Sequence, residues 1–358
     1  MRVLFRIVYI GCCIVLYCSG AAAQQWPSPD VEQLHVHAQE YMARGNYVGA
    51  IKDYRHAIAL APKEQLLHRE LGRAQYMAGS YEEAAKTLRG AIGLAGTEAG
   101  TYQLLAISEE RQGHTKAAQR VLADGLAKFS TSGLLHYERG RILYNGADDE
   151  GALNAWLDGI QKEPAHAANY YEAARVYLGS SRVAWGLIYG ETYLAMRHDT
   201  ANDTTMKRLL FAGWHKVFEQ LPLMRSDDPQ GFEATLLNEL LVLSPVVSDG
   251  ISTENLAMLR ARLAMQWQRG AGSKYPLSII NWWDGLMGDG WFDIYTEWAY
   301  GSAENEREYA AWNTFHEGEI AKWQEWLGAH PLVPAAGFYN DRNMVGLWKR
   351  GKGRHSKR

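Results

Sequence analysis

Residues 38–62 read AQEYMARGNYVGAIKDYRHAIALAP, and this stretch decides the fold. Its two small residues Ala38 and Ala50, its glycine Gly45 and its closing Pro62 each begin a series that returns every 34 residues. The series are Ala38, Gly72, Ala106, Gly140, Ala174; Gly45, Gly79, Gly113, Ala147; Ala50, Ala84, Ala118, Ala152; and Pro62, Gly96, Ser130, Pro164. A fixed period of this length predicts stacked copies of one short structural unit.

Bulky and small residues also alternate between these positions. The bulky residues are Tyr54, Leu88, Leu122 and Trp156, and the small ones that follow are Ala57, Ala91, Gly125 and Gly159. Small residues where two helices cross let the backbones approach, while a ring or a leucine fills the space beside them. The glycines of the series that begins at Gly45 are placed to end the first helix of each unit in a left-handed conformation. Each closing proline ends a second helix. The pattern therefore predicts pairs of antiparallel helices.

These small, aromatic and proline positions resemble the tetratricopeptide repeat family over about Val31 to Leu178. The resemblance implies an all-α helix-turn-helix solenoid whose first helices line a concave face. We expect four regular units and one degenerate unit in residues 31–198. Gly186 and Gly190 replace the expected alanine and bulky residue of the fifth unit, which predicts a distorted second helix there.

In this family, inward positions of the first helices contact extended peptides or partner helices. The matching residues here are His35, Gln39, Met42; Arg69, Arg73, Tyr76; Gln103, Ile107, Glu110; Tyr137, Arg141, Tyr144; and Tyr171, Arg175, Leu178. Arginine and tyrosine are enriched at binding hot spots. We therefore expect a partner-binding groove formed by Arg69, Arg73, Tyr76, Tyr137, Arg141, Tyr144, Tyr171 and Arg175.

An alternative interpretation pairs these arginines with neighbouring acids and places the tyrosines in the seams between helices. If the groove interpretation is right, Arg73→Glu with Arg141→Glu should abolish partner capture and leave thermal melting nearly unchanged. The subclass that grips a C-terminal carboxylate normally has lysine and asparagine where this chain has His35 and Gln39. An adaptor for chaperone tails is therefore not expected.

The N-terminus has the layout of a secretory signal peptide over residues 1–23. Arg2 and Arg6 precede an apolar run over residues 7–18, and Ala23 ends a stretch of small residues. A membrane anchor would need about 20 apolar residues, and Tyr17 disfavours lipid attachment to the cysteine that follows it. We expect cleavage after Ala23 and a periplasmic or secreted protein.

All three cysteines, Cys12, Cys13 and Cys18, fall within that signal peptide. The mature chain would have no thiol, which excludes disulfides, cysteine nucleophiles and cysteine-ligated metals. The 358-residue chain has a formal net charge of −3, and residues 24–348 alone carry −11. An acidic body disfavours nonspecific nucleic-acid binding. Residues 345–358 form a basic tail that we expect to be disordered.

The sequence of residues 199–335 predicts a further α-helical region that lacks the 34-residue repeat. Ser252 is placed as an N-cap and Gly270 as a stop for one helix. Ser302 and Glu304 are placed to open a second helix that runs to about Leu327. Glycines at 285, 288 and 290 punctuate the stretch between them.

Tryptophan is dense in this second half, where nine of the thirteen follow residue 266. This density resembles the C-terminal regions of exported bacterial repeat proteins, which implies no activity. Carboxylates interleaved with indole rings could form a sugar site, since rings stack on pyranoses and paired acids cleave glycosides. The candidate glycan residues are Trp282, Trp283, Asp284, Trp291 and Asp293. Core packing is the favoured interpretation of these aromatics.

The sequence has no nucleotide-binding loop, no zinc-protease motif and no serine-hydrolase motif. We expect no enzyme activity, no metal, no cofactor and no membrane span in the mature chain. The leading hypothesis is an exported scaffold or adaptor that binds a protein or peptide in its Arg/Tyr groove. The alternatives are an envelope protein that binds or cleaves glycans, and a structural component of an envelope complex.

Overall fold

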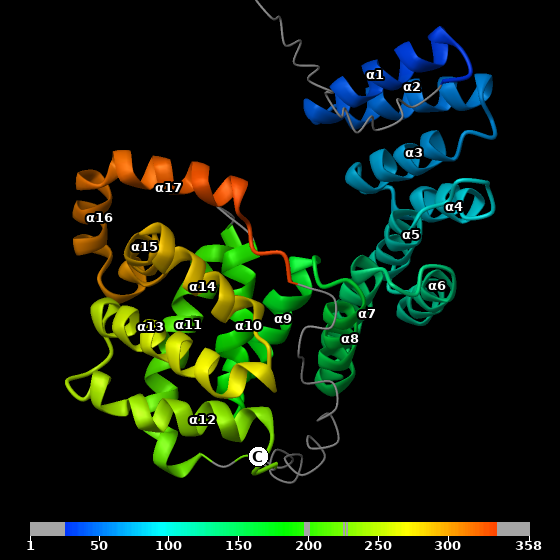
Figure 1. Cartoon of the computed structure of the whole chain (residues 1–358). Helices are drawn as coiled ribbons and strands as arrows, with labels where there is room; N and C mark the ends of the chain where they lie inside the picture. Colours follow the sequence, from blue (N-terminus) through cyan, green and yellow to red (C-terminus); the bar gives the residue numbers. More distant parts are fainter. Residues whose placement is uncertain (1–25, 197–200, 225, 227, 335–358) are drawn as a thin grey trace, which may run out of the picture.

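The computed structural model describes residues 26–196, 201–224, 226 and 228–334, and all regular elements in these ranges are helices. The first half forms five antiparallel helix pairs stacked into a curved arm (Figure 1). The pairs are α1 (Pro29–Ala43) with α2 (Tyr47–Leu60), α3 (Gln65–Met77) with α4 (Tyr81–Ala91), α5 (Ala99–Arg111) with α6 (Thr115–Lys128), α7 (Gly133–Asn145) with α8 (Asp149–Lys162), and α9 (Ala167–Leu178) with α10 (Val183–Met196). The predicted all-α repeat solenoid is confirmed.

The second half folds into a more compact helical body beside the end of the arm (Figure 1). Its α-helices are α11 (Ala201–Gln220), α12 (Phe232–Leu243), α13 (Thr253–Arg269), α14 (Ser278–Asp289), α15 (Phe292–Glu304), α16 (Glu306–Phe315) and α17 (Glu317–Ala329). Three short 3₁₀ turns connect them: η1 (Leu221–Leu223), η2 (Ser244–Val247) and η3 (Ala271–Ser273). Among the described residues, none of the helices is both long enough and apolar enough to cross a membrane.

The small residues form the seams between helices, as the repeat pattern predicts. Ala50, Ala84, Ala118 and Ala152 have no exposed surface. A Cβ on Gly72 would lie 2.5 Å from Leu88 Cγ, so a larger residue there would have to displace Leu88. The predicted bulky residues that fill these gaps are at most 1% exposed.

The turns inside the repeats have the predicted left-handed conformation. Gly45, Gly79 and Gly113 have φ angles of 72°, 79° and 81°. Ala147 occupies the same place in the fourth unit with φ of 59°, although its Cβ disfavours that region. Asp148 follows it and accepts a hydrogen bond from Gly151 N at 3.0 Å, which caps α8.

The fifth unit differs from the expectation of a distorted second helix, because α10 is continuous over 14 residues. Its glycines are points of close contact. A Cβ on Gly186 would lie 2.7 Å from Leu178, and one on Gly190 would lie 2.8 Å from Leu210 of α11. Every residue from Val183 to Ala195 is buried. The unit departs from the repeat pattern because its second helix is covered on all sides.

In the second half, α13 begins and ends where predicted, with the Ser252 hydroxyl accepting from Asn255 N at 3.1 Å. The expected single helix over 302–327 is wrong. Ser302 and Glu304 end α15, and the Asn305 side chain then accepts from two backbone amides to start α16. A further break at His316 separates α16 from α17.

The hydrophobic core is unevenly distributed. One cluster runs from Ala152 to Leu332 and joins the last repeats to the C-terminal helices. The arm from α1 to α7 instead contains three small clusters. The predicted boundary between residues 198 and 199 stays a prediction. The predicted signal peptide and basic tail lie outside the described residues.

Candidate partner-binding surface

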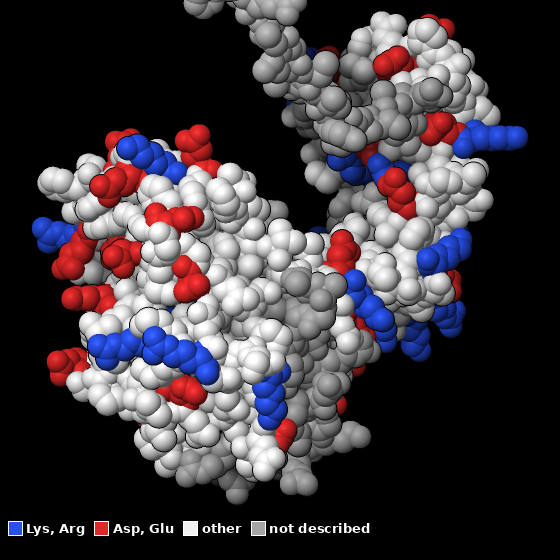
Figure 2. Space-filling view, viewed as in Figure 1, with Lys and Arg blue, Asp and Glu red and all other residues white. Residues whose placement is uncertain are grey.

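The predicted groove residues lie on the first helices of the units. α3 and α5 lie on the side of the arm that faces the C-terminal body, whereas α4 and α6 lie on the outer side (Figure 1). The residues come from α3 (Arg69, Arg73, Tyr76), α7 (Tyr137, Arg141, Tyr144) and α9 (Tyr171, Arg175). The N-terminal end of the arm stands away from the body (Figure 2).

Each of these three helices has a glutamate three residues before its inner arginine. The ion pairs are Glu70–Arg73 at 2.7 Å, Glu138–Arg141 at 2.7 Å and Glu172–Arg175 at 2.8 Å. Residues three apart lie on one helix face, so the 34-residue period repeats the pair along the arm. Acidic and basic side chains therefore intermix along the arm instead of forming a basic strip (Figure 2).

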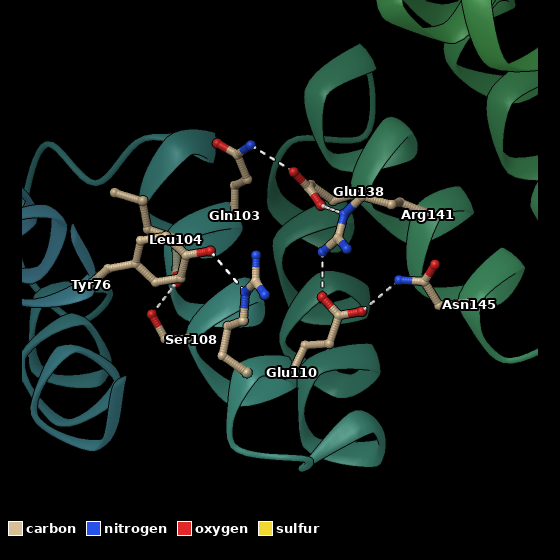
Figure 3. Close-up of polar contacts among 9 residues, drawn as sticks. Tyr76, Gln103, Leu104, Ser108, Glu110, Glu138, Arg141 and Asn145 are labelled. Carbon is tan, nitrogen blue, oxygen red and sulfur yellow. Dashed lines mark hydrogen bonds and ion pairs between the residues drawn. The ribbon is translucent and has the colours of Figure 1, made fainter. Parts of the chain in front are cut away.

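The third unit interrupts this ladder of charged pairs. Its α5 has Leu104 and Ile107 at the two positions, and both are half-buried. Glu110, one turn later, makes an ion pair with Arg141 of α7 and accepts from Asn145 Nδ2 at 3.1 Å (Figure 3). An apolar step thus separates the charged pairs of α3 and α7.

Arg141 pairs with glutamates from two units. It contacts Glu110 and Glu138, and Glu138 also accepts from Gln103 Nε2 at 2.8 Å. Burial lowers the pKa of Arg141, but its bonds to the two carboxylates outweigh burial and raise the pKa overall. Arg141→Glu would place three carboxylates together, so the expectation of unchanged melting no longer follows for that substitution.

The tyrosines also make contacts within the arm. Tyr76 accepts a hydrogen bond from Arg111 Nε at 3.2 Å, and the Arg175 guanidinium lies 4.9 Å from the Tyr144 ring centre. The other two are half-buried, and burial raises the pKa of their hydroxyls: Tyr137 and Tyr171. The alternative interpretation describes these contacts. These contacts nonetheless leave part of the inner surface accessible. The side chain of Arg73 is 45% exposed and Tyr144 is 37% exposed.

A pocket opens at the N-terminal end of the surface, between α1 and α3. Its volume is about 360 Å³, and its lining residues are Gln39, Met42, Ala43, Tyr47, Arg73 and Met77. Three of them occupy inward positions named by the repeat pattern: Gln39, Met42 and Arg73. His35, also named by the pattern, is buried against the Trp26 ring at a centroid distance of 4.5 Å and belongs to the core.

One further inward position was not predicted from the sequence. Ala43 and Met77 line the pocket and stand 34 residues apart, so the same position recurs at Arg111 and Asn145. The glutamates that pair with the inner arginines were expected only as unnamed neighbouring acids, in the alternative interpretation. Both sets follow from the 34-residue period, because each of their residues comes directly after an inward position that the repeat pattern names.

The candidate glycan residues do not assemble around a cavity. Trp283 is 1% exposed and packs in the core, whereas Asp284 and Asp293 are exposed. Trp282 is half-buried, and its Nε1 donates to the His330 carbonyl at 3.2 Å. Trp291 is half-buried at the start of α15.

A cavity of about 410 Å³ lies beside Asp293. The residues that line it are Glu254, Ala257, Met258, Ala261, Met287, Gly290, Phe292 and Asp293. No tryptophan is among them, so the cavity lacks the indole face on which a sugar ring would stack. In the described ranges, no three metal-binding side chains gather either.

A buried ion pair connects the fifth unit to the C-terminal body, and nothing in the linear sequence indicates it. Arg260 of α13 has no exposed surface, and its Nη2 lies 3.1 Å from Glu191 Oε2 of α10. Tyr295 donates to the same oxygen at 2.9 Å, and Tyr300 donates to the other. Burial raises the pKa of both phenols well above the ordinary value, so they remain donors.

Comparison with protein families matches a tetratricopeptide repeat model to residues 35–99 and 104–169. The chain carries tetratricopeptide repeats. The matched segments cover most of the first four units of the arm and stop before most of the fifth. No curated protein matches the sequence.

Several solved structures are similar to parts of this chain. The crystal structure of MamA protein is 19% identical, covering 46% of this chain and 90% of its own, with a TM-score of 0.38. A thermophilic tetratricopeptide repeat protein of Thermus thermophilus is 18% identical over 50% of this chain and 98% of its own, with a TM-score of 0.42. A repeat protein from Parabacteroides merdae is 14% identical over 71% and 97%, with a TM-score of 0.40.

Proposed function

We propose that this chain is a scaffold whose inner repeat surface binds a protein or a peptide. The observation that carries the proposal is the pocket between α1 and α3, whose lining includes Tyr47 and the partly exposed Arg73. Rigid aromatic and guanidinium groups next to an apolar pocket are typical of binding hot spots. Tetratricopeptide repeats as a class bind protein partners.

We propose further that the scaffold acts outside the cytoplasm. Support comes from Arg2 and Arg6, the apolar run over 7–18 and the small residues ending at Ala23. These residues lie outside the described ranges. The glycan alternative is not carried forward, because its aromatic residues pack in the body or lie away from the cavity.

Photo-cross-linking in cells would test the binding surface. p-Benzoylphenylalanine replaces Gln39 or Tyr144 on the inner face, and Lys86 or Arg120 on the outer helices serves as the matched exposed control. We expect discrete adducts from the inner positions only. The intact mass of the purified protein would also show whether the chain begins at Gln24.

Equal adducts from inner and outer positions, or none from any, would contradict the scaffold proposal. An N-terminus at Met1 would contradict the export proposal alone. The cross-linking result therefore tests the scaffold proposal, and the intact mass separately tests the export proposal.

A further inference from the structure

The inner face of α3 combines an apolar and a cationic element. Arg73, Tyr76 and Met77 are three and four residues apart, so they share one helix face. Met77 is 50% exposed and lines the pocket opposite Met42 of α1. Methionine side chains are flexible and polarisable, and they adapt to apolar groups of varied shape. The pocket is therefore suited to a large apolar side chain.

Arg111, at the end of α5, is the arginine of this surface that has no carboxylate partner among the described residues. Its side chain is exposed and donates through Nε to the Tyr76 hydroxyl at 3.2 Å. Glu110 precedes it in the chain, but its two oxygens contact Arg141 and Asn145. The guanidinium of Arg111 therefore retains donors that no acid in the described ranges uses.

The other inner arginines contrast with Arg111, because each pairs with at least one glutamate. Arg69 contacts Glu70 at 3.3 Å and also Glu98, and Arg73 contacts Glu70 at 2.7 Å. Arg141 and Arg175 are paired in the same way. Arg111 lies on α5, the same helix on which Leu104 and Ile107 replace the charged pair.

We infer that this surface selects an extended peptide segment in which a large apolar side chain enters the Met42–Met77 pocket and an acidic side chain binds Arg111. The inference rests on the proposed function, since it names the partner class for the same surface. Tyr76 links the two subsites, because it neighbours Met77 in α3 and accepts the hydrogen bond from Arg111. A guanidinium paired with a carboxylate forms charge-assisted hydrogen bonds, which are stronger than neutral ones.

A basic segment would fit this surface less well. Its cation would approach Arg73 and Arg111, and the nearby carboxylates of Glu70 and Glu110 already contact arginines. Like charges brought together at an interface disfavour binding. The charge arrangement thus distinguishes acidic from basic ligands.

Selection of a random phage-displayed peptide library on the full chain would test the inference. We expect the selected peptides to combine Asp or Glu with a large apolar residue. A synthetic representative should lose at least about tenfold in affinity towards Arg111→Glu and towards Met77→Glu. Replacing its acidic residue by lysine should weaken binding to the original chain and restore binding to Arg111→Glu.

Arg120→Glu is the matched control, since it makes the same charge change at an exposed position of the outer helix α6. It should leave peptide affinity unchanged, and the melting temperatures of the three variants confirm that they fold. Selected peptides without acidic residues, or an affinity unchanged by Arg111→Glu, would overturn the inference. The scaffold proposal would survive that result if the inner cross-links form. If neither peptides nor cross-links are obtained, both proposals fail.

Discussion

His35 is a side chain whose role depends on its surroundings more than on its repeat position. It is 8% exposed, and its ring lies 4.5 Å from Trp26 and 6.1 Å from Tyr54, measured between centroids. Burial lowers its pKa below 6.5; Glu70 of α3 opposes this effect and Arg73 adds to it. The folded first unit therefore favours the neutral imidazole.

Acidification should loosen the first unit through this histidine. As the pH falls below about 6.5, the unfolded chain takes up a proton that the folded chain resists. Stability is therefore lost from that pH down to the lower folded pKa, and is unaffected above it. Hydrogen exchange of α1 and α2, corrected for intrinsic rates, should show lower protection at a pH of about 5.5 than at about 7.5. His35→Gln should reduce this difference, and an equal loss in the variant would contradict the assignment.

The glutamate–arginine pairs have a modest energetic role at the scale of single residues. Partly exposed pairs of this kind contribute about 0–1 kcal/mol each, because water screens them and ordering the side chains has an entropic cost. They fix the orientation of the arginines more than they stabilise the arm. Arg111 differs because its partner within the described part of the chain is the neutral Tyr76 hydroxyl.

At the scale of elements, glycine has opposite effects at different positions of a helix. A Cβ on Gly140 of α7 would lie 2.6 Å from Trp156 Cδ1, and Trp156 is 1% exposed. A Cβ on Gly285, inside α14, would meet nothing within 4 Å. The first glycine is a packing requirement, whereas the second only lowers helix propensity.

Alanine substitutions should separate these two roles. Gly140→Ala should destabilise the chain by about 1–3 kcal/mol through overpacking of the α7–α8 seam. Gly285→Ala should stabilise it by about 0.5–1 kcal/mol, because alanine restricts the unfolded backbone more than glycine does. Urea unfolding followed by circular dichroism gives both signs. Equal effects from the two substitutions would show that the seam tolerates a methyl group.

At the scale of the whole molecule, α10 is the point where the repeat arm and the C-terminal body meet. It packs against α9 on one side and against α11, α12 and α14 on others. The Glu191–Arg260 pair lies within this junction. The arginine also sits among aromatic rings, 4.6 Å from the centre of Trp283 and 5.1 Å from that of Tyr295. Cation–π contacts add to the ion pair in this dry environment.

Breaking the pair on one side should be costly. Arg260→Met leaves a buried carboxylate without its cation, with an expected loss of about 3–5 kcal/mol. Arg260→Met combined with Glu191→Gln should recover part of that loss, since the amide removes the buried charge and its one oxygen still accepts from a tyrosine. Urea midpoints monitored by tryptophan fluorescence compare the variants. A double variant as unstable as Arg260→Met would show that lost packing, not the isolated charge, is the cause.

The sequence by itself determined the repeat architecture, because small, bulky and turn residues returning every 34 positions admit one way of pairing helices. It also located the inward positions, since neighbouring units place equivalent residues on one face. Two contacts depended on tertiary structure. Glu110 pairs with Arg141 of the next unit, 31 positions away, and Arg260 pairs with Glu191 across 69 positions. Periodicity describes which positions are equivalent, whereas ion pairing and burial depend on which helices pack together in space.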